Sequence, residues 1–576
     1  MALSFMDAAA QTSFQQPFII NIFDTNGDTH LCDEAHPICV FGEVLIEGKS
    51  ASRSDILKSF QSCDHDIYQL YSKLSGQFSL IIYHDNELLL ITDLFNTVPI
   101  FYTWDATNNN VLISNSLRQL AKNIAKPIRW NQQAIFNYFY FHCIPSPETI
   151  YQGIYKCNQG CLTRLNEQRK VVEQILYTPA YATHKDKYNE EPQHCFSLLK
   201  QAMAPALSKQ TGAFLSGGLD SSTLAGLLSQ AQKEAPTFSL GFHEKRYDET
   251  PFAEITARKF NTQHHTKLLD SDEAYECLVE MIQGFEQPFG NSSALATYFC
   301  AKHAAQNGIK TLIAGDGGDE IFAGNERYVK QKVFHLYQFV PNSIKPIFDI
   351  FFINKLAKSI PLLKKVASYI EQAKLPLVNR IESYNFINHF GSERIFHSDF
   401  LKQVDIEQPT NAQQQRLDQC PSDDLVEKLL YLDWKYTLAD NDIVKVNEAS
   451  QMSGILPWFP FLDKNVVNYS CDIPSSIKLP GFKLRHFFRK SCKGFLAQET
   501  LTKSKHGFGL PFGHWLKTNH KFQELALQQI EDFKRRNILK PEFIDDLLTE
   551  HKKGSEQYYG EFVWLILVLE LWLIKS

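Results

Sequence analysis

The hydrophobic pattern divides the chain into two parts. From Phe18 to about Tyr181, short β-branched or aromatic runs alternate with turns of Asn, Asp and Gly; they are FIINIF, ICVFGEVLI, FSLIIYH, ELLLITD and VLISNS. A polar stretch without periodicity, Thr183 to His194, then contains a proline and is typical of a linker. We therefore expect a β-rich domain over residues 1–185 and a boundary near residue 190.

Beyond the linker, apolar strand-like runs alternate with helical patterns. The strand-like runs end near residues 215, 242 and 313, and the helical patterns cover 222–230, 249–260 and 298–306. Such alternation predicts a parallel sheet that binds ligands at the carboxyl ends of its strands. After about residue 325 the pattern is mostly helical. The fold class is therefore α/β and α+β, with a second domain over 195–576.

Composition narrows the possible functions. The chain has 576 residues, with 44% hydrophobic and 21% charged residues, which indicates a soluble globular protein of two or more domains. A net charge of −6 gives no basic surface for nucleic acid. Twelve scattered cysteines and the absence of a secretory signal favour reduced thiols and a cytoplasmic location. The apolar run Phe562 to Ile574 is too short for a membrane span, carries Glu570, and predicts a buried C-terminal helix.

The most informative motif is SGGLDSS, which joins an apolar strand to a helix. Gly217 and Gly218 allow the backbone to approach an anion, and the first N–H groups of the helix carry partial positive charge. Asp220 can hold Mg²⁺, while Ser216 and Ser221 offer hydroxyl donors to phosphate. No lysine follows as in a Walker loop. The alternative is an ordinary strand-to-helix turn with a serine N-cap.

Two further loops support a nucleotide site. IAGDGGDE, residues 313–320, ends a second strand in an acidic glycine loop, so Asp319 and Asp220 are the predicted ligands of Mg²⁺ bound to a triphosphate. In KSKHGFGLP, residues 503–511, a lysine on a glycine-rich loop suits the charge that builds on leaving pyrophosphate. Taken alone, the acidic loop could equally be a solvated turn, and most lysines are solvated surface residues.

Taken in order, SGGLDSS, SLGF, QHH, AGDGGDE, PFLD and KHGFGLP resemble the synthetase domain of the asparagine synthetase family, over roughly residues 195–520. The resemblance implies a PP-loop ATP pyrophosphatase domain behind an amidohydrolase domain of the N-terminal-nucleophile class. Such enzymes use ATP to form an acyl-adenylate and pyrophosphate, and an amine then captures the acyl group as an amide.

The resemblance also implies roles for individual residues. Lys505 would stabilise the adenylation transition state, and Asp316 would act as a base for the amine or orient it. Mg²⁺ would bind Asp220 and Asp319. The ATP- and pyrophosphate-binding residues would be Phe214, Ser216, Gly217, Gly218, Leu219, Asp220, Ser221, Leu240, Ala314 and Gly315.

The chain departs from the family at two places. Glutamine-dependent members attack glutamine with an N-terminal cysteine, but Ala2 stands here and the glutamine-recognising segments are missing. We therefore expect residues 1–185 to form a degenerate type 2 glutamine amidotransferase domain without glutaminase activity. Before PFLD, charged positions have become Glu448, Leu456 and Trp458. This change makes an aromatic acceptor pocket, unless Trp458 is simply part of the core.

These features indicate an ATP-dependent, AMP-forming amide ligase that works without glutamine on a small-molecule or peptide carboxylate and an amine. The altered region favours a macrolactam cyclase of the lasso-peptide type, with a precursor peptide and a protease as partners. An ammonia-dependent asparagine synthetase or a tailoring amidotransferase is the alternative within the class. A regulatory homologue without turnover is the alternative from another class, and a tRNA-modifying enzyme is disfavoured by the acidic balance.

Overall fold

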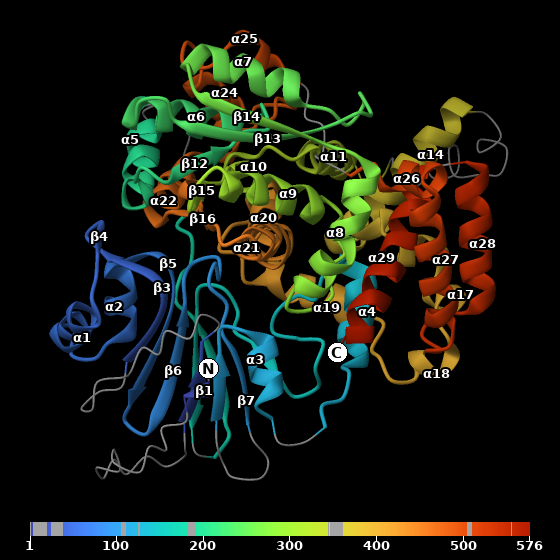
Figure 1. The fold of residues 1–576 in the computed structure, drawn as a ribbon, viewed down its shortest axis with the longest axis horizontal. Coiled ribbons are helices and arrows are strands. Elements are labelled where there is room, and N and C mark those ends of the chain that lie inside the picture. The colour runs from blue at the N-terminus through green and yellow to red at the C-terminus, as the bar shows by residue number, and fades with distance from the viewer. Residues whose placement is uncertain are drawn as a thin grey trace.

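The structure is a computed structural model that describes residues 2–3, 20–24, 38–104, 111–124, 127–166, 168–182, 192–341, 343, 345, 361–503, 510–554 and 556–575. Three sheets organise this part of the chain (Figure 1). Two of them lie in the N-terminal domain, drawn in blue and teal. The third lies above them in the view and carries the helices of the second domain. The predicted mixed fold, β-rich first and α/β afterwards, is confirmed.

Two sheets build the N-terminal domain. The six-stranded sheet has the order β11 (Val171–Ile175), β10 (Cys161–Asn166), β6 (Glu87–Thr92), β5 (Leu74–His84), β3 (Ile38–Ile46), β4 (Lys49–Ser50). The five-stranded sheet has the order β1 (Ala2–Leu3), β2 (Ile20–Phe23), β8 (Val111–Ser114), β7 (Phe101–Trp104), β9 (Tyr155–Lys156). The predicted strands at 38–46, 78–84, 87–92 and 111–114 are all present.

Alternation along the strands explains how these sheets pack. Ile81 and Leu90 face a core shared with the second sheet, whereas Leu80 and Ile82 face the opposite side. On that side they contact α1 (Arg53–Ser62) and α2 (Ile67–Lys73), which supply residues such as Phe60. The N-terminal domain therefore keeps a complete core on both faces of its larger sheet.

The third sheet is parallel throughout, as the alternating pattern predicts. Its order is β14 (Gln263–Leu269), β13 (Pro236–Phe242), β12 (Thr211–Phe214), β15 (Thr311–Ile313), β16 (Leu456–Trp458). From β12 the chain adds strands in one direction, and β15 then starts on its other side. The strand order thus switches between β12 and β15, and such switch points are where α/β sheets bind ligands.

Helices connect these strands, and the helix that precedes the first strand begins inside the predicted linker. α5 (Pro192–Met203) begins before His194, because its amphipathic stretch extends into the linker; residues 183–191 lie outside the described part. The helices between strands are α6 (Leu219–Ala231), α7 (Thr250–Phe260), α8 (Ser271–Gly284) and α9 (Ser293–Gln306). The predicted patterns at 222–230, 249–260 and 298–306 lie within α6, α7 and the second half of α9, and α6 begins three residues earlier than predicted.

The remainder is largely helical. The elements that matter below are α10 (Gly318–Phe322), α11 (Glu326–His335), α15 (Leu377–Ile381), α16 (Phe386–Phe390), α19 (Gln408–Asp418), α20 (Leu425–Asp433), a π-helix (Trp434–Asp442), α21 (Ile443–Gln451), α24 (His486–Ser491) and α29 (Glu556–Lys575). The run at 562–573 in α29 is buried, as predicted. Among the described residues, no helix has the length and hydropathy needed to cross a membrane.

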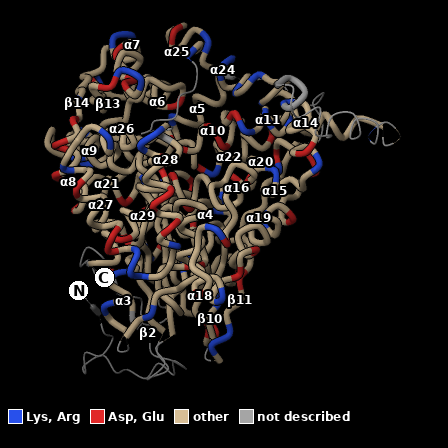
Figure 2. The backbone as a smooth tube through the Cα atoms, turned by 90° about the vertical axis from the view of Figure 1, so that its right-hand side faces the viewer, with Lys and Arg blue, Asp and Glu red and all other residues tan. Residues whose placement is uncertain are grey.

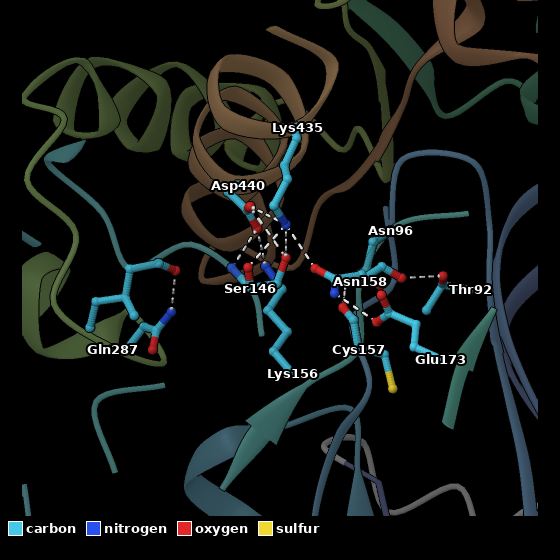
Figure 3. A network of polar contacts seen from close by, with 11 residues as sticks. Thr92, Asn96, Ser146, Lys156, Cys157, Asn158, Glu173, Gln287, Lys435 and Asp440 are labelled. Carbon is cyan, nitrogen blue, oxygen red and sulfur yellow. Dashed lines mark hydrogen bonds and ion pairs between the residues drawn. The ribbon is translucent and has the colours of Figure 1, made fainter. Parts of the chain in front are cut away.

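Helix α4 (Gln132–Phe141) links the two domains. It lies within the predicted N-terminal domain, yet it packs into the helical core of the C-terminal half, where Tyr138 donates a hydrogen bond to the carbonyl of Leu565 over 2.9 Å. A buried polar cluster also crosses between the domains (Figure 3). In it, Lys435 and Asp440 of the π-helix contact Ser146 and Lys156. The domains are therefore joined by both apolar and charged contacts.

Charges of both signs are scattered over the side of the molecule that Figure 2 shows. Lys and Arg positions lie among Asp and Glu positions there, and neither sign dominates this side. This distribution agrees with the small net charge of −6. On this side, the described part of the backbone carries no basic stripe of the kind that follows a nucleic-acid backbone.

Candidate active site

Two glycine-rich loops meet where the strand order of the parallel sheet switches. β12 and β15 are adjacent and in register, with Ala213 opposite Ile313. The SGGLDSS loop leaves the carboxyl end of β12, and the AGDGGDE loop leaves that of β15. The sheet therefore brings together the two motifs that the sequence predicts to share a ligand.

The first loop is held by its own serines. Ser221 Oγ accepts a hydrogen bond from the Ser216 N–H over 3.2 Å and lies 3.1 Å from Ser216 Oγ. Gly218 is the N-cap of α6, and its carbonyl accepts from the Ser222 N–H. The first N–H groups of α6 thus open onto the loop, as an anion cradle requires.

Gly217 has a different role from the one expected. Its φ is +70°, and a Cβ there would lie 2.5 Å from the backbone nitrogen of Ala253 in α7. Glycine is needed at this position so that α7 can pack against the loop, and Gly217 does not line the cavity described below. Gly218, where an added Cβ would meet no atom closer than 3.3 Å, is the glycine that faces the cavity.

The two predicted metal ligands lie side by side and share a cation. Arg485 donates to the Asp220 carboxylate from both terminal nitrogens, over 2.5 Å from Nη1. The same Nη1 lies 2.9 Å from Asp319 Oδ1. Burial alone would lower the pKa of Arg485, but Asp220 and Asp319 raise it well above its usual value, so the guanidinium stays charged.

Asp316 belongs to a second acidic group at the same loop. Lys445 Nζ in α21 lies 3.6 Å from Asp316 Oδ1 and 2.7 Å from Asp442 Oδ1. Burial raises the pKa of Asp316 to about 6, since it outweighs the opposing effect of Lys445, and Asp442 raises it further. A carboxyl group with this pKa exchanges protons readily near neutral pH.

The third motif is only partly described, because Lys505 lies outside the described residues. Its neighbour Lys503 reaches the first loop and donates to the Ser216 carbonyl over 3.3 Å. Lys503 also pairs with Glu249 at 3.1 Å and is largely buried. A lysine of the predicted motif therefore lies at the cradle, two positions before Lys505 in the sequence.

These groups surround a cavity of about 710 Å³. It is lined by most of the predicted residues, namely Phe214, Ser216, Gly218, Leu219, Asp220, Ser221, Leu240, Gly315, Asp316 and Asp319. Ala314 is fully buried behind the loop and does not line it. Acidic side chains outnumber Lys445, Arg485, Arg489 and Lys503 around the wall, so a polyphosphate would need added positive charge to bind here.

The altered positions before PFLD do not form an acceptor pocket. Trp458 is 6% exposed within the core, where its Nε1 donates to the Ala202 carbonyl over 2.7 Å. Glu448 lies at the domain interface and accepts from the Glu286 N–H over 2.8 Å. Neither lines the cavity. Of the two interpretations of Trp458, the structure therefore supports the core.

Comparison with known proteins places the chain in a family. The family model described as asparagine synthase matches residues 196–574, and a glutamine amidotransferase domain model matches residues 48–177. The chain belongs to the asparagine synthase family. It is therefore placed among ATP-dependent carbon–nitrogen ligases, as its motifs predict.

Individual relatives are distant but extensive. A glutamine-hydrolysing asparagine synthetase of Bacillus subtilis is 23% identical over 87% of this chain and 78% of its own length. A putative asparagine synthetase of Methanocaldococcus jannaschii is 29% identical over 67% of this chain and 76% of its own. A solved glutamine phosphoribosylpyrophosphate amidotransferase of B. subtilis, at 8% identity, covers 50% of this chain and 62% of its own with a TM-score of 0.18, too low to carry an argument.

Sequence reasoning missed several charged residues of this asparagine synthase family site. Arg485 lies in a short loop before α24, outside any glycine motif, so no local signal marks it. Lys445 and Asp442 are spaced i and i+3, as for a pair on one helix face, and that spacing could have suggested them. Glu249 precedes α7 and is identified only through its contact with Lys503.

Proposed function

We propose that this member of the asparagine synthase family adenylates a carboxylate and passes the acyl group to an amine without hydrolysing glutamine. One observation carries the proposal: the two glycine loops meet at Asp220, Arg485 and Asp319, on the wall of the 710 Å³ cavity. The SGGLDSS cradle would hold the pyrophosphate part of ATP. Phe214, Leu240 and Gly315 would contact the nucleoside.

Mg²⁺ would bind ATP here through Asp220 and Asp319. Two neighbouring carboxylates suit this cation, which completes its coordination with phosphate oxygens and water. The excess of acidic side chains around the cavity is consistent with such a cation. Bound Mg²⁺ supplies positive charge that offsets the charge of the phosphates. Arg485 holds the two carboxylates together and adds a fixed charge beside them.

In the first step, a substrate carboxylate oxygen attacks the α-phosphorus, and the bond to pyrophosphate breaks. Lys503 and Lys505 would stabilise the negative charge on the departing group. In the second step, the amine nitrogen attacks the acyl carbon, and the bond to AMP breaks. Asp316, oriented by Lys445, would accept the proton that the amine loses.

The N-terminal domain provides the reasons for proposing that the chain does not hydrolyse glutamine. The glutamine-recognising segments are missing from the sequence. Among the described cysteines of that domain, Cys39, Cys63, Cys143, Cys157 and Cys161 are all buried. Burial raises the pKa of Cys161 to about 12, which opposes the thiolate that glutamine attack requires. The amine would therefore come from the substrate or from solution.

Within this class, the best specific proposal is closure of a peptide macrolactam, in which a side-chain carboxylate is adenylated and the peptide's own amine attacks it. A second cavity beside the first supports a substrate larger than aspartate. A precursor peptide and a protease that frees its amine would then be partners. An ammonia-dependent asparagine synthetase is the alternative.

The test measures exchange of radiolabelled pyrophosphate into ATP with the purified full chain, Mg²⁺ and candidate acids. These are aspartate and linear peptides that carry an internal Asp or Glu. We expect exchange with peptides, AMP as the nucleotide product, and no glutamate release from glutamine. Exchange with aspartate alone would favour the asparagine synthetase. ATP cleavage to ADP, or glutaminase activity above background, would overturn the proposal.

A further inference from the structure

A second cavity of about 440 Å³ adjoins the first. Asn325 and Thr437 line both cavities, and Asn291 in the first wall donates to Asn441 in the second over 2.7 Å. The π-helix sets this arrangement, because it places Thr437 on the shared wall and Tyr436 in the second cavity. π-Helical turns are often found at functional sites. A substrate that reacts in the first cavity can therefore extend into the second.

Aromatic rings form much of this second wall. They come from distant elements: Tyr140 and Phe141 end α4, Phe386 begins α16, Tyr436 lies in the π-helix, and Phe562 lies in α29. Some stack on each other, as Phe141 and Tyr436 do with centroids 5.1 Å apart. A lining of this kind suits an apolar chain or the face of a cation.

The charged groups of the wall favour a cation. Asp433 is paired with Arg327 at 2.7 Å, and Glu561 at the rim faces His142 at 3.3 Å. Glu382 is different, because its Oε1 accepts from the neutral amide of Gln413 over 2.8 Å, and among the described residues no lysine or arginine forms an ion pair with it. Burial raises the pKa of Glu382 and outweighs the opposing effects of the Gln413 amide and the Arg327 charge.

Two buried polar atoms of the wall lack hydrogen-bond partners among the described residues. Gln413 is 3% exposed, and its Oε1 acceptor has no donor; Arg327 Nε is a donor without an acceptor. Both residues line the cavity. An unmatched acceptor and an unmatched donor are each costly when buried, and the backbone of a peptide offers both a donor and an acceptor.

We infer that the second cavity binds a cationic peptide segment of the substrate. The segment's amide would pair with Gln413 Oε1 and Arg327 Nε, its basic side chain would reach Glu382, and its apolar part would lie on the rings of Phe141 and Tyr436. This inference rests on the proposed function, since it assigns the part of the substrate that does not react.

The test uses three blocked dipeptides as probes: acetyl-Phe-Lys-amide, acetyl-Phe-norleucine-amide and acetyl-Phe-Glu-amide. Their binding to the full chain is measured by titration calorimetry with a non-hydrolysable ATP analogue present. We expect the lysine probe to bind about tenfold more tightly than the norleucine probe, since it adds one hydrogen bond to a buried charge. The glutamate probe should not bind.

Glu382→Gln keeps the size of the side chain and should erase the preference for lysine, whereas Glu393→Gln, on the exposed side of α17 (Ser392–Ile395), should preserve it. Tyr384→Ala, at the exposed rim, should weaken binding of the lysine and norleucine probes alike. Equal binding of the three probes, or preference for glutamate, would overturn the inference. The affinity for the ATP analogue is measured in a separate titration. If the lysine probe is preferred but the ATP analogue does not bind, the ligase proposal fails and the inference about the second cavity stands.

Discussion

The molecule contains two buried clusters of charge that resemble each other in composition and differ in surroundings. The interdomain cluster consists of Lys156, Lys435 and Asp440 with the polar groups around them (Figure 3). The active-site cluster consists of Asp220, Asp319 and Arg485. Each joins carboxylates to cations from distant parts of the chain. Of the two cavities described above, the first is lined by the active-site cluster, and neither is lined by the interdomain cluster.

In the interdomain cluster, the protein itself supplies the hydrogen-bond partners. Lys435 donates to the carbonyl and hydroxyl of Ser146, over 3.0 and 2.9 Å, and to Asn158 Oδ1 over 2.7 Å. Asp440 accepts from the Ser146 N–H and lies 3.4 Å from both lysines. These charges leave no place for a ligand, so their role is to fix how the domains dock.

In the active-site cluster, the same kinds of charge remain next to open space. The side chains of Asp220 and Asp319 are 16% and 20% exposed, whereas that of Asp440 is 2% exposed. Burial of charge alone therefore does not mark a site. The presence of a cavity beside the charges separates a ligand-binding cluster from a structural one.

The largest expected effect comes from Asp440→Asn. Removing this carboxylate leaves Lys156 and Lys435 buried without a counter-charge, which costs about 3–5 kcal/mol of stability. Urea unfolding followed by circular dichroism measures the loss. Asp399→Asn, which breaks the exposed pair with Lys402, should change the stability far less, because water screens exposed charges. A cost as small for Asp440 would show that the interdomain cluster does not hold the domains together.

Asp220→Asn should have the opposite effect, with a small change in stability and a large loss of activity. Arg485 keeps Asp319 at 2.9 Å and the cavity admits water, so stability should change by less than about 1 kcal/mol. Pyrophosphate exchange should fall on the order of 10²–10³-fold, as for removal of a group that stabilises charge in a transition state. Unfolding comparable to that of Asp440→Asn, or unchanged exchange, would remove the distinction between the two clusters.

Two of the three residues of the active-site cluster were predictable from the sequence. Asp220 and Asp319 follow strands in glycine loops, and parallel strands bring such loops to one edge, so local signals suffice. Arg485 carries no such signal, because its position depends on a left-handed backbone with φ of 54° and on contacts with loops more than 160 residues away. Nothing in the pattern around it distinguishes it from a surface arginine.

The interdomain cluster and the second cavity were not predictable. Both depend on the π-helix at residues 434–442, which departs from the period of 3.6 residues on which sequence reasoning relies. This segment directs Lys435 and Asp440 to the N-terminal domain and Thr437 to the cavities. The strands of the N-terminal domain, in contrast, were predictable because their alternating residues repeat over several neighbouring strands.

The smallest expected effect concerns a second carboxyl group at the domain interface, Glu448. Burial and the nearby Glu286 raise the pKa of Glu448 to about 8, whereas at Asp440 the two lysines outweigh burial and lower the pKa. Two residues of the N-terminal domain bind Glu286: its carboxylate accepts hydrogen bonds from the Ser116 hydroxyl and the Arg118 N–H, each over 2.8 Å. Glu448 is thus a neutral acid in the folded protein at pH 7.

This difference gives the interface a defined dependence on pH. The unfolded chain releases the Glu448 proton near its ordinary pKa of about 4.5, while the folded chain keeps it up to about pH 8. Over that range the unfolded state binds fewer protons, so the wild-type protein loses stability as the pH rises. Glu448→Gln keeps the acceptor for the Glu286 N–H and should be more stable than the wild type by about 2 kcal/mol at pH 6, with no gain at pH 4. Urea titrations at both pH values measure this, and an equal shift at both would mean that Glu448 is ionised in the folded protein.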